Sequence, residues 1–67
     1  MTNFCKNLKY FRKKRGIRQV DLGKILGVRQ TTISGWEIGR AEPNIEQLIQ
    51  LSSILQVCVD RLIKEEL

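Results

Sequence analysis

Apolar residues recur at three- and four-residue intervals in five stretches of the chain, as they do along the buried face of a helix. In the first stretch this face carries Phe4, Leu8 and Phe11, and Gly16 follows as a helix terminator. Thr2 or Asn3 is placed to cap the start. The pattern predicts an all-α fold. Its five helices span about residues 4–15, 19–26, 30–37, 45–55 and 59–65.

The second and third helices are short and lie on either side of Gly27, a residue that tolerates the left-handed backbone used to end a helix. The apolar stripe of the second helix consists of Val20, Leu22, Ile25 and Leu26. In the third helix, Ile33 and Trp36 are expected to face the core; Trp36 stacking on a base is the alternative. Two such helices joined by a tight glycine turn are typical of a helix-turn-helix, here residues 19–38, whose second helix can enter the DNA major groove.

The last two helices follow a loop in which Gly39 permits a turn. Asn44, with Gln47 three residues on, has the capping-box pattern of a helix start. The apolar stripe of the fourth helix consists of Ile45, Leu48, Ile49, Leu51 and Leu55. In the fifth helix Leu62 and Ile63 point inward, and partial exposure is expected for Val59 and Leu67.

A chain of 67 residues predicts one small domain, residues 1–67. Its two cysteines, Cys5 and Cys58, without any histidine, do not supply the four ligands of a structural zinc site, so we expect two reduced thiols and no metal or cofactor. No signal peptide and no apolar run of membrane-spanning length is present. We therefore expect a cytoplasmic protein that does not bind a membrane.

Charge is unevenly distributed along the chain, whose net charge is +5. Residues 1–40 hold ten of the twelve Lys and Arg residues and only two of the seven Asp and Glu residues. The basic part therefore coincides with the helix-turn-helix, which is the electrostatic footprint of a polyanion binder. The alternative is a basic helix face that is simply solvated.

The motif resembles the helix-turn-helix of the phage repressor and Cro family, also called XRE-type regulators. The residues that carry the resemblance are Gln19, Leu22-Gly23, Leu26-Gly27-Val28, Thr32-Ile33-Ser34, Trp36-Glu37 and Gly39. The likeness extends over roughly residues 7–63. It implies a compact five-helix domain similar to that of lambda repressor. Gly23 stands where the family usually has alanine, a change that costs about 0.5–1 kcal/mol of helix stability.

By this resemblance, Gln30, Thr31 and Ser34 are expected to contact bases, and the chemistry of Arg29, which departs from the family pattern, adds a fourth base contact. Their chemistry fits, because glutamine can bond adenine through two edges, threonine can meet a thymine methyl and arginine can read guanine. Arg29 replaces the family's usual Ser or Thr cap, and a cation there opposes the helix dipole unless phosphate binds. The alternative is that the helix begins later, with Thr31 as its cap.

A second group of residues is expected to contact DNA phosphates: Arg18, Gln19, Arg40, Lys13, Lys14 and Arg15. Lys13, Lys14 and Arg15 have an equally good alternative, since cations in the last turn also stabilise a helix end. Arg18 replaces a usual cap and cannot accept a backbone N–H. The resemblance further implies a structural ion pair between Arg12 and Glu37, which would tie the first helix to the end of the third.

The resemblance implies a sequence-specific, double-stranded DNA-binding transcriptional regulator, in the first instance a repressor, that binds an inverted-repeat operator as a homodimer. We expect the two-fold contact to lie in the fifth helix and the C-terminal tail, and no small-molecule ligand, as in minimal Cro-like members. The alternative is an antitoxin or other protein-interaction module. An enzyme is disfavoured, because the sequence has no histidine and no nucleophile paired with a base.

Overall fold

The computed structural model describes residues 3–65, and these form helices without any strand. The helices are α1 (Phe4–Lys14), α2 (Gln19–Leu26), α3 (Gln30–Glu37), α4 (Ile45–Leu55) and α5 (Val59–Lys64). The predicted five-helix all-α fold is confirmed, with α1 and α5 each one residue shorter than predicted. Within residues 3–65, none of these short helices has the length and apolar character needed to cross a membrane.

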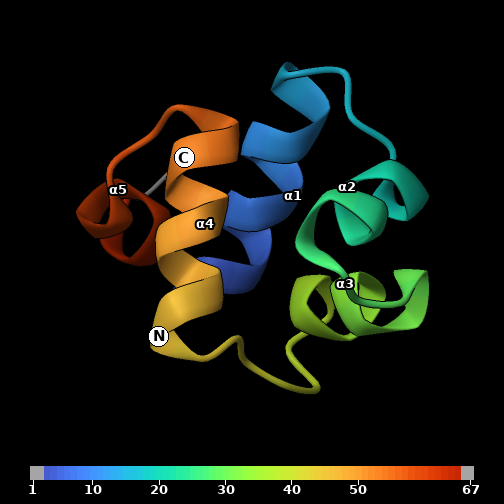
Figure 1. Cartoon of the computed structure of the whole chain (residues 1–67). Helices are drawn as coiled ribbons and strands as arrows, with labels where there is room; N and C mark the ends of the chain where they lie inside the picture. The colour runs from blue at the N-terminus through green and yellow to red at the C-terminus, as the bar shows by residue number, and fades with distance from the viewer. Residues whose placement is uncertain (1–2, 66–67) are drawn as a thin grey trace.

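Helix α1 lies between α2 and α3 on one side and α5 on the other, and α4 packs against α5 (Figure 1). Its apolar face, Phe4, Leu8 and Phe11, is almost completely buried, as the sequence predicted. Each helix is too short to persist alone, so their stability comes from burying these apolar faces together. The other core residues are Leu22, Ile33, Trp36, Leu48, Leu51, Leu55, Val57 and Leu62.

Four apolar side chains assigned to buried stripes are exposed instead. In α2, Val20 and Ile25 are 36% and 59% exposed. In α4, Ile45 and Ile49 are 76% and 59% exposed. The predicted stripes were too wide, because each of these helices buries only one narrow row of residues against the rest of the fold. In α2 the fully buried member of that row is Leu22.

Asn3 lies at the N-cap position of α1, but its side chain does not accept the expected cap hydrogen bond. Its backbone N–H instead donates to the carbonyl of Ile63 at 3.1 Å, and its side-chain amide donates to that of Lys64 at 3.4 Å. The predicted cap at Asn3 is therefore wrong, since this residue serves the end of α5. The other cap candidate, Thr2, and the exposure predicted for Leu67 lie outside the described residues.

The predicted capping box at the start of α4 is confirmed. The side chain of Asn44 accepts a hydrogen bond from the backbone N–H of Gln47 at 2.8 Å, and the Gln47 side chain accepts one from the Asn44 backbone at 2.9 Å. Gly16 and Gly39 adopt positive φ angles of 69° and 78° at the turns where the sequence placed them. These local signals set the ends of the helices that position α3.

Candidate nucleic-acid interface

The corner between α2 and α3 directs the start of α3 away from the core. Gly27 ends α2 in the left-handed conformation, with φ 74°. The next residue, Val28, donates its backbone N–H to the carbonyl of Gly23 at 2.9 Å, which folds the turn back onto α2. Helix α3 then begins at Gln30, so its first turn follows the corner directly.

The first turn of α3 is the most exposed part of this helix. Arg29 occupies the N-cap position with an extended backbone and makes no side-chain cap hydrogen bond. Because α3 starts at Gln30, the alternative of a later start capped by Thr31 is wrong. Arg29, Gln30 and Thr31 are exposed and Ser34 is half-buried. The four residues expected to read bases thus lie at or near the accessible end of α3.

The opposite face of α3 is buried. Ile33 is fully buried and Trp36 is 3% exposed. Both belong to the hydrophobic core with Leu8 and Leu22. The core interpretation of Trp36 is therefore correct, and base stacking by this side chain is excluded in this arrangement.

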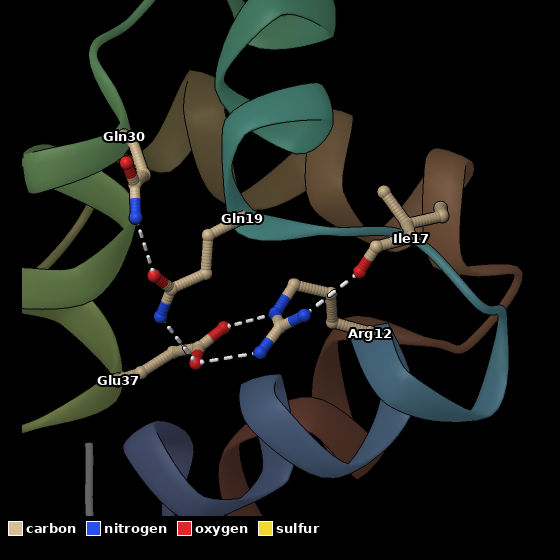
Figure 2. Close-up of polar contacts among 5 residues, drawn as sticks. All are labelled: Arg12, Ile17, Gln19, Gln30 and Glu37. Carbon is tan, nitrogen blue, oxygen red and sulfur yellow. Dashed lines mark hydrogen bonds and ion pairs between the residues drawn. The ribbon is translucent and has the colours of Figure 1, made fainter.

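A buried ion pair holds the carboxyl end of α3 against α1. Arg12 donates through Nε to Glu37 Oε2 at 2.6 Å and through a second nitrogen to Oε1 at 3.1 Å (Figure 2). The two side chains are only 9% and 2% exposed. The remaining arm of the Arg12 guanidinium donates to the carbonyl of Ile17 at 2.8 Å, in the segment that leads into α2. The pair implied by the resemblance is present, and it also anchors the start of the helix-turn-helix.

Two glutamines continue this contact to the surface. Gln19 donates from Nε2 to Glu37 Oε1 at 3.0 Å, and its Oε1 accepts a hydrogen bond from Gln30 Nε2 at 3.1 Å (Figure 2). The sequence did not predict these bonds. One sequence signal could have indicated them: Gln19 and Gln30 are the first residues of the two helices of the helix-turn-helix. The structure therefore joins an expected phosphate contact and an expected base contact to the structural ion pair.

The side chain of Arg18 is paired with Asp21, a contact that the sequence did not lead us to expect. Its Nε donates to Asp21 Oδ2 at 2.8 Å across one turn at the start of α2. This hydrogen bond lowers the pKa of Asp21 below its usual range and raises the pKa of Arg18. Both side chains are accessible, 76% and 41% exposed. The predicted phosphate contact would therefore require Arg18 to share or leave Asp21, a partner recognisable from its three-residue spacing.

The basic cluster at the end of α1 divides in the structure. Arg15 donates from Nε to the carbonyl of Leu55 at 3.0 Å, at the end of α4. Lys14 lies over the ring of Tyr10, 5.7 Å from its centroid. Arg15 thus stabilises a helix end, although that of α4 rather than its own. Lys13 and Arg40 remain exposed.

The helix-turn-helix family matches residues 8–62, most of the chain. The chain belongs to this family. The family match confirms the predicted XRE type of this chain. Repressor protein C2 of Salmonella phage P22 agrees with it and is 50% identical over 56 residues. That match covers 84% of this chain and 26% of the P22 protein.

Two further comparisons agree with this family. The HTH-type transcriptional regulator YqaE of Bacillus subtilis is 36% identical over 63 residues, which cover 94% of this helix-turn-helix chain and 54% of YqaE. The chain therefore spans between about a quarter and a half of these curated relatives. The crystal structure of the P22 c2 repressor in complex with synthetic operator 9T has a TM-score of 0.87 and 43% identity, over 94% of this chain and 96% of that one. This match confirms the predicted lambda-repressor-like fold class.

Proposed function

We propose that this helix-turn-helix protein binds double-stranded DNA in a sequence-specific manner, as a homodimer on an inverted-repeat operator, and regulates transcription as a repressor. The observation that carries the proposal is the exposed start of α3, on a helix whose other end is held against α1 by the buried pair of Arg12 and Glu37. A rigidly supported helix end with polar side chains is what major-groove reading requires. The likeness to the P22 c2 repressor, whose crystal structure includes an operator, supports the same assignment.

Base reading is proposed for Arg29, Gln30, Thr31 and Ser34. The first three are exposed at the end of α3 that follows the corner, and Ser34 lies about one turn further on. Arginine and glutamine can each bond a base through two atoms, which gives more discrimination than a single hydrogen bond. Cofactors and catalysis have no part in this proposal.

Phosphate contacts are proposed for Arg18, Gln19 and Arg40, together with the exposed Lys13 of the α1 cluster. Arg18 and Gln19 stand at the start of α2, where free backbone N–H groups also favour an anion. A phosphate contact is also proposed for Lys14 and Arg15. Arg15 would have to release the carbonyl of Leu55 to make it. Because the proposed ligand is genomic DNA, we place the protein in the cytoplasm.

The homodimer is proposed to form through α5 and the C-terminal tail. The described part of α5 turns Asp60 and Lys64 outward, whereas Leu62 is fully buried. Strongly exposed apolar side chains lie elsewhere instead, and α4 carries two of them, Ile45 and Ile49, beside Ile25 and Ile38 in other segments. Sedimentation equilibrium on Lys64→Glu and Ile49→Glu separates these two surfaces. Weaker self-association of the α5 variant alone supports the proposal, and weaker self-association of the α4 variant alone moves the contact to α4.

The decisive experiment is selection of binding sites from a randomised duplex library at near-physiological salt. An inverted repeat with half-sites about one helical turn apart, ~34 Å, is expected for a dimeric reader. Binding that is salt-sensitive but enriches no sequence would limit the protein to backbone affinity. An antitoxin-like role would then be examined by capture of a partner protein.

Gln30→Ala identifies the base pair read by α3. Its binding should weaken by about 1–3 kcal/mol at the preferred base and lose preference at that position alone. Arg18→Ala provides the contrast, because loss of a phosphate contact weakens binding to every sequence and reduces the salt dependence. A uniform loss for Gln30→Ala would remove its base-reading role.

A further inference from the structure

We propose that a pocket lined by Lys14, Arg15 and Arg61 binds a small organic anion, in which a carboxylate or phosphate group is carried on an apolar body. The pocket lies where the end of α1 meets the corner between α4 and α5. Helices α2 and α3 lie on the other side of α1 (Figure 1). The volume of the pocket is about 230 Å³.

Three cations from two helices converge on this pocket. Lys14 and Arg15 come from the end of α1, and Arg61 comes from α5. None of the described residues that line the pocket is acidic. The positive charge is therefore not cancelled by a carboxylate in the lining, and a recess of this kind attracts an anion.

Both arginines are held through their Nε atoms, Arg15 by the carbonyl of Leu55 and Arg61 by Glu65, at 3.0 Å each. Arg61 also lies over the ring of Phe11, 5.2 Å from its centroid, which is a cation–π contact. Among residues 3–65, neither arginine makes a hydrogen bond through its terminal nitrogens. The two guanidinium groups are thus held in place while their terminal N–H groups can bind an oxyanion in pairs.

The floor of the pocket is apolar. Phe11, Leu55 and Val57 line it and are buried, whereas the three cations are exposed, so the apolar side chains lie beneath the charged ones. An apolar group of a ligand would be removed from water on this floor, which favours an organic anion over an inorganic one. Sites for drug-sized ligands have volumes of about 300–1,000 Å³. At about 230 Å³ this pocket fits a smaller molecule.

Gln56 adds a strained side chain at the edge of the pocket. It follows the last residue of α4 in the left-handed conformation, with φ 55° and ψ 48°. Among the described residues it is the one non-glycine with a positive φ. Glycine or asparagine usually takes this position, because other side chains are strained there. Such strain recurs at ligand sites, and the Gln56 amide, which lines the pocket, can donate to an anion.

The pocket differs from the proposed DNA interface in Arg61. Lys14 and Arg15 are also proposed for phosphate contacts, whereas Arg61 has no part in them. In the pocket, Arg15 keeps its bond to the carbonyl of Leu55, which a DNA contact would break. A ligand here would depart from the absence of a small molecule that the family resemblance implied.

NMR titration of the isotope-labelled, DNA-free protein with benzoate at constant ionic strength tests the pocket. We expect saturable shifts of the backbone amides of Gln56 and Val57 and of the Nε–H signals of Arg15 and Arg61. Benzamide has the same ring without the charge, and inorganic phosphate has no apolar body, so each should bind about fivefold more weakly or less. Shifts that do not saturate and spread over all surface cations would overturn the site. Equal binding of benzoate and benzamide would overturn its anionic character, and equal binding of benzoate and phosphate its apolar one.

Arg61→Gln tests the guanidinium of α5. The dissociation constant of benzoate should rise by about fivefold or more, because charge-assisted hydrogen bonds are lost. Lys14→Gln, on α1, should weaken binding in the same direction. The matched control is Lys64→Gln, which removes one exposed positive charge from the same helix as Arg61. Equal weakening by Arg61→Gln and Lys64→Gln would reduce the effect to net charge and overturn the pocket, as would native affinity in both Arg61→Gln and Lys14→Gln.

Gln56→Gly separates ligand binding from folding. Glycine accepts the left-handed backbone without strain, so the midpoint of thermal unfolding should rise. The affinity for benzoate should fall, because the side-chain amide is lost. Higher stability with native affinity would overturn the role of Gln56. These measurements use the protein without DNA, so the pocket can stand when the selection of binding sites enriches no sequence, and it can fail when the selection succeeds.

Discussion

A Cβ atom placed on Gly23 would lie 2.7 Å from the backbone oxygen of Val28, across the corner between α2 and α3. The two residues are also joined by a hydrogen bond of 2.9 Å from the Val28 N–H to the Gly23 carbonyl, so neither backbone can move away freely. By the family resemblance, this glycine was expected at a close helix contact, where it fits but lowers helix stability relative to alanine. The structure shows that its small size permits the close approach of the two helices.

Gly23→Ala should therefore destabilise the protein although alanine is the better helix former. The matched control is Gly35→Ala in α3, where an added Cβ meets no atom within 4 Å. There the same change should stabilise the fold by about 0.5–1 kcal/mol, since only the helix-propensity gain remains. Urea unfolding of both variants measures the difference. Equal stabilisation by both would mean that the corner relaxes at no cost.

The helix positions were predictable because their signals are local. Gly16, Gly27 and Gly39 take the positive φ angles expected of them, and the Asn44 capping box forms as its spacing indicated. Each of these depends on residues within one turn of the chain. The exposed and buried faces of α3 were predictable for the same reason, because Ile33 and Trp36 are three residues apart.

Contacts between helices were not predictable to the same degree. The bond from Gln19 to Glu37 joins the start of α2 to the end of α3, and Arg15 joins α1 to the end of α4. Periodicity states that a side chain faces outward or inward, not which distant group it meets. The Arg12–Glu37 pair was expected only because the family resemblance placed the two residues together. Ile49 was wrongly assigned to the buried stripe of α4 for the same reason. In the sequence, an apolar residue next to the buried row cannot be told from an apolar residue within that row.

Arg12→Ala and Glu37→Ala should each destabilise the fold by about 3–5 kcal/mol, because either change leaves the other charge buried without its partner. The double variant Arg12→Met with Glu37→Leu should be more stable than either single alanine variant, since it removes both charges and keeps apolar volume. Thermal unfolding of the native protein, the two single variants and the double variant compares their stabilities. Additive losses in the double variant would show that the two side chains do not depend on each other.

Asn7→Ala should destabilise the protein by about 1–3 kcal/mol, although this residue is distant from α3. Asn7 is 1% exposed and its amide nitrogen lies 3.2, 3.0 and 2.9 Å from the carbonyls of Arg61, Leu62 and Glu65. It thereby satisfies the end of α5, where helix carbonyls lack partners within the helix. Its position between Phe4 and Leu8 on the buried face of α1 was the sequence signal for this role, and it was missed.

The control for this prediction is Asn3→Ala. Asn3 reaches the same end of α5, but through a longer side-chain bond of 3.4 Å at an exposed position. Its truncation should change the free energy of unfolding by less than about 0.5 kcal/mol, as surface changes usually do. Similar losses for Asn3→Ala and Asn7→Ala in urea unfolding would contradict the special importance of the buried amide.

Asp21→Asn should strengthen DNA binding to every sequence, because it releases Arg18 from its carboxylate partner, 2.8 Å away. The Asp21 pKa is lowered by this hydrogen bond, so the pair is intact at neutral pH and is lost only as the pH falls through that lowered value. Asp21 and a DNA phosphate would therefore compete for the Arg18 side chain at neutral pH. An arginine freed to neutralise one phosphate should steepen the dependence of log K on log salt concentration by up to about 0.9.

The control is Asp60→Asn, which removes the same charge from α5, where Asp60 lies 3.6 Å from Lys64. Fluorescence anisotropy of a labelled operator duplex, measured between low and moderate salt, compares the two variants with the native protein. A long-range charge effect would raise affinity equally in both, because it depends on net charge alone. A steeper salt slope confined to Asp21→Asn would assign the gain to Arg18 at the phosphate backbone, whereas equal slopes would withdraw that contact.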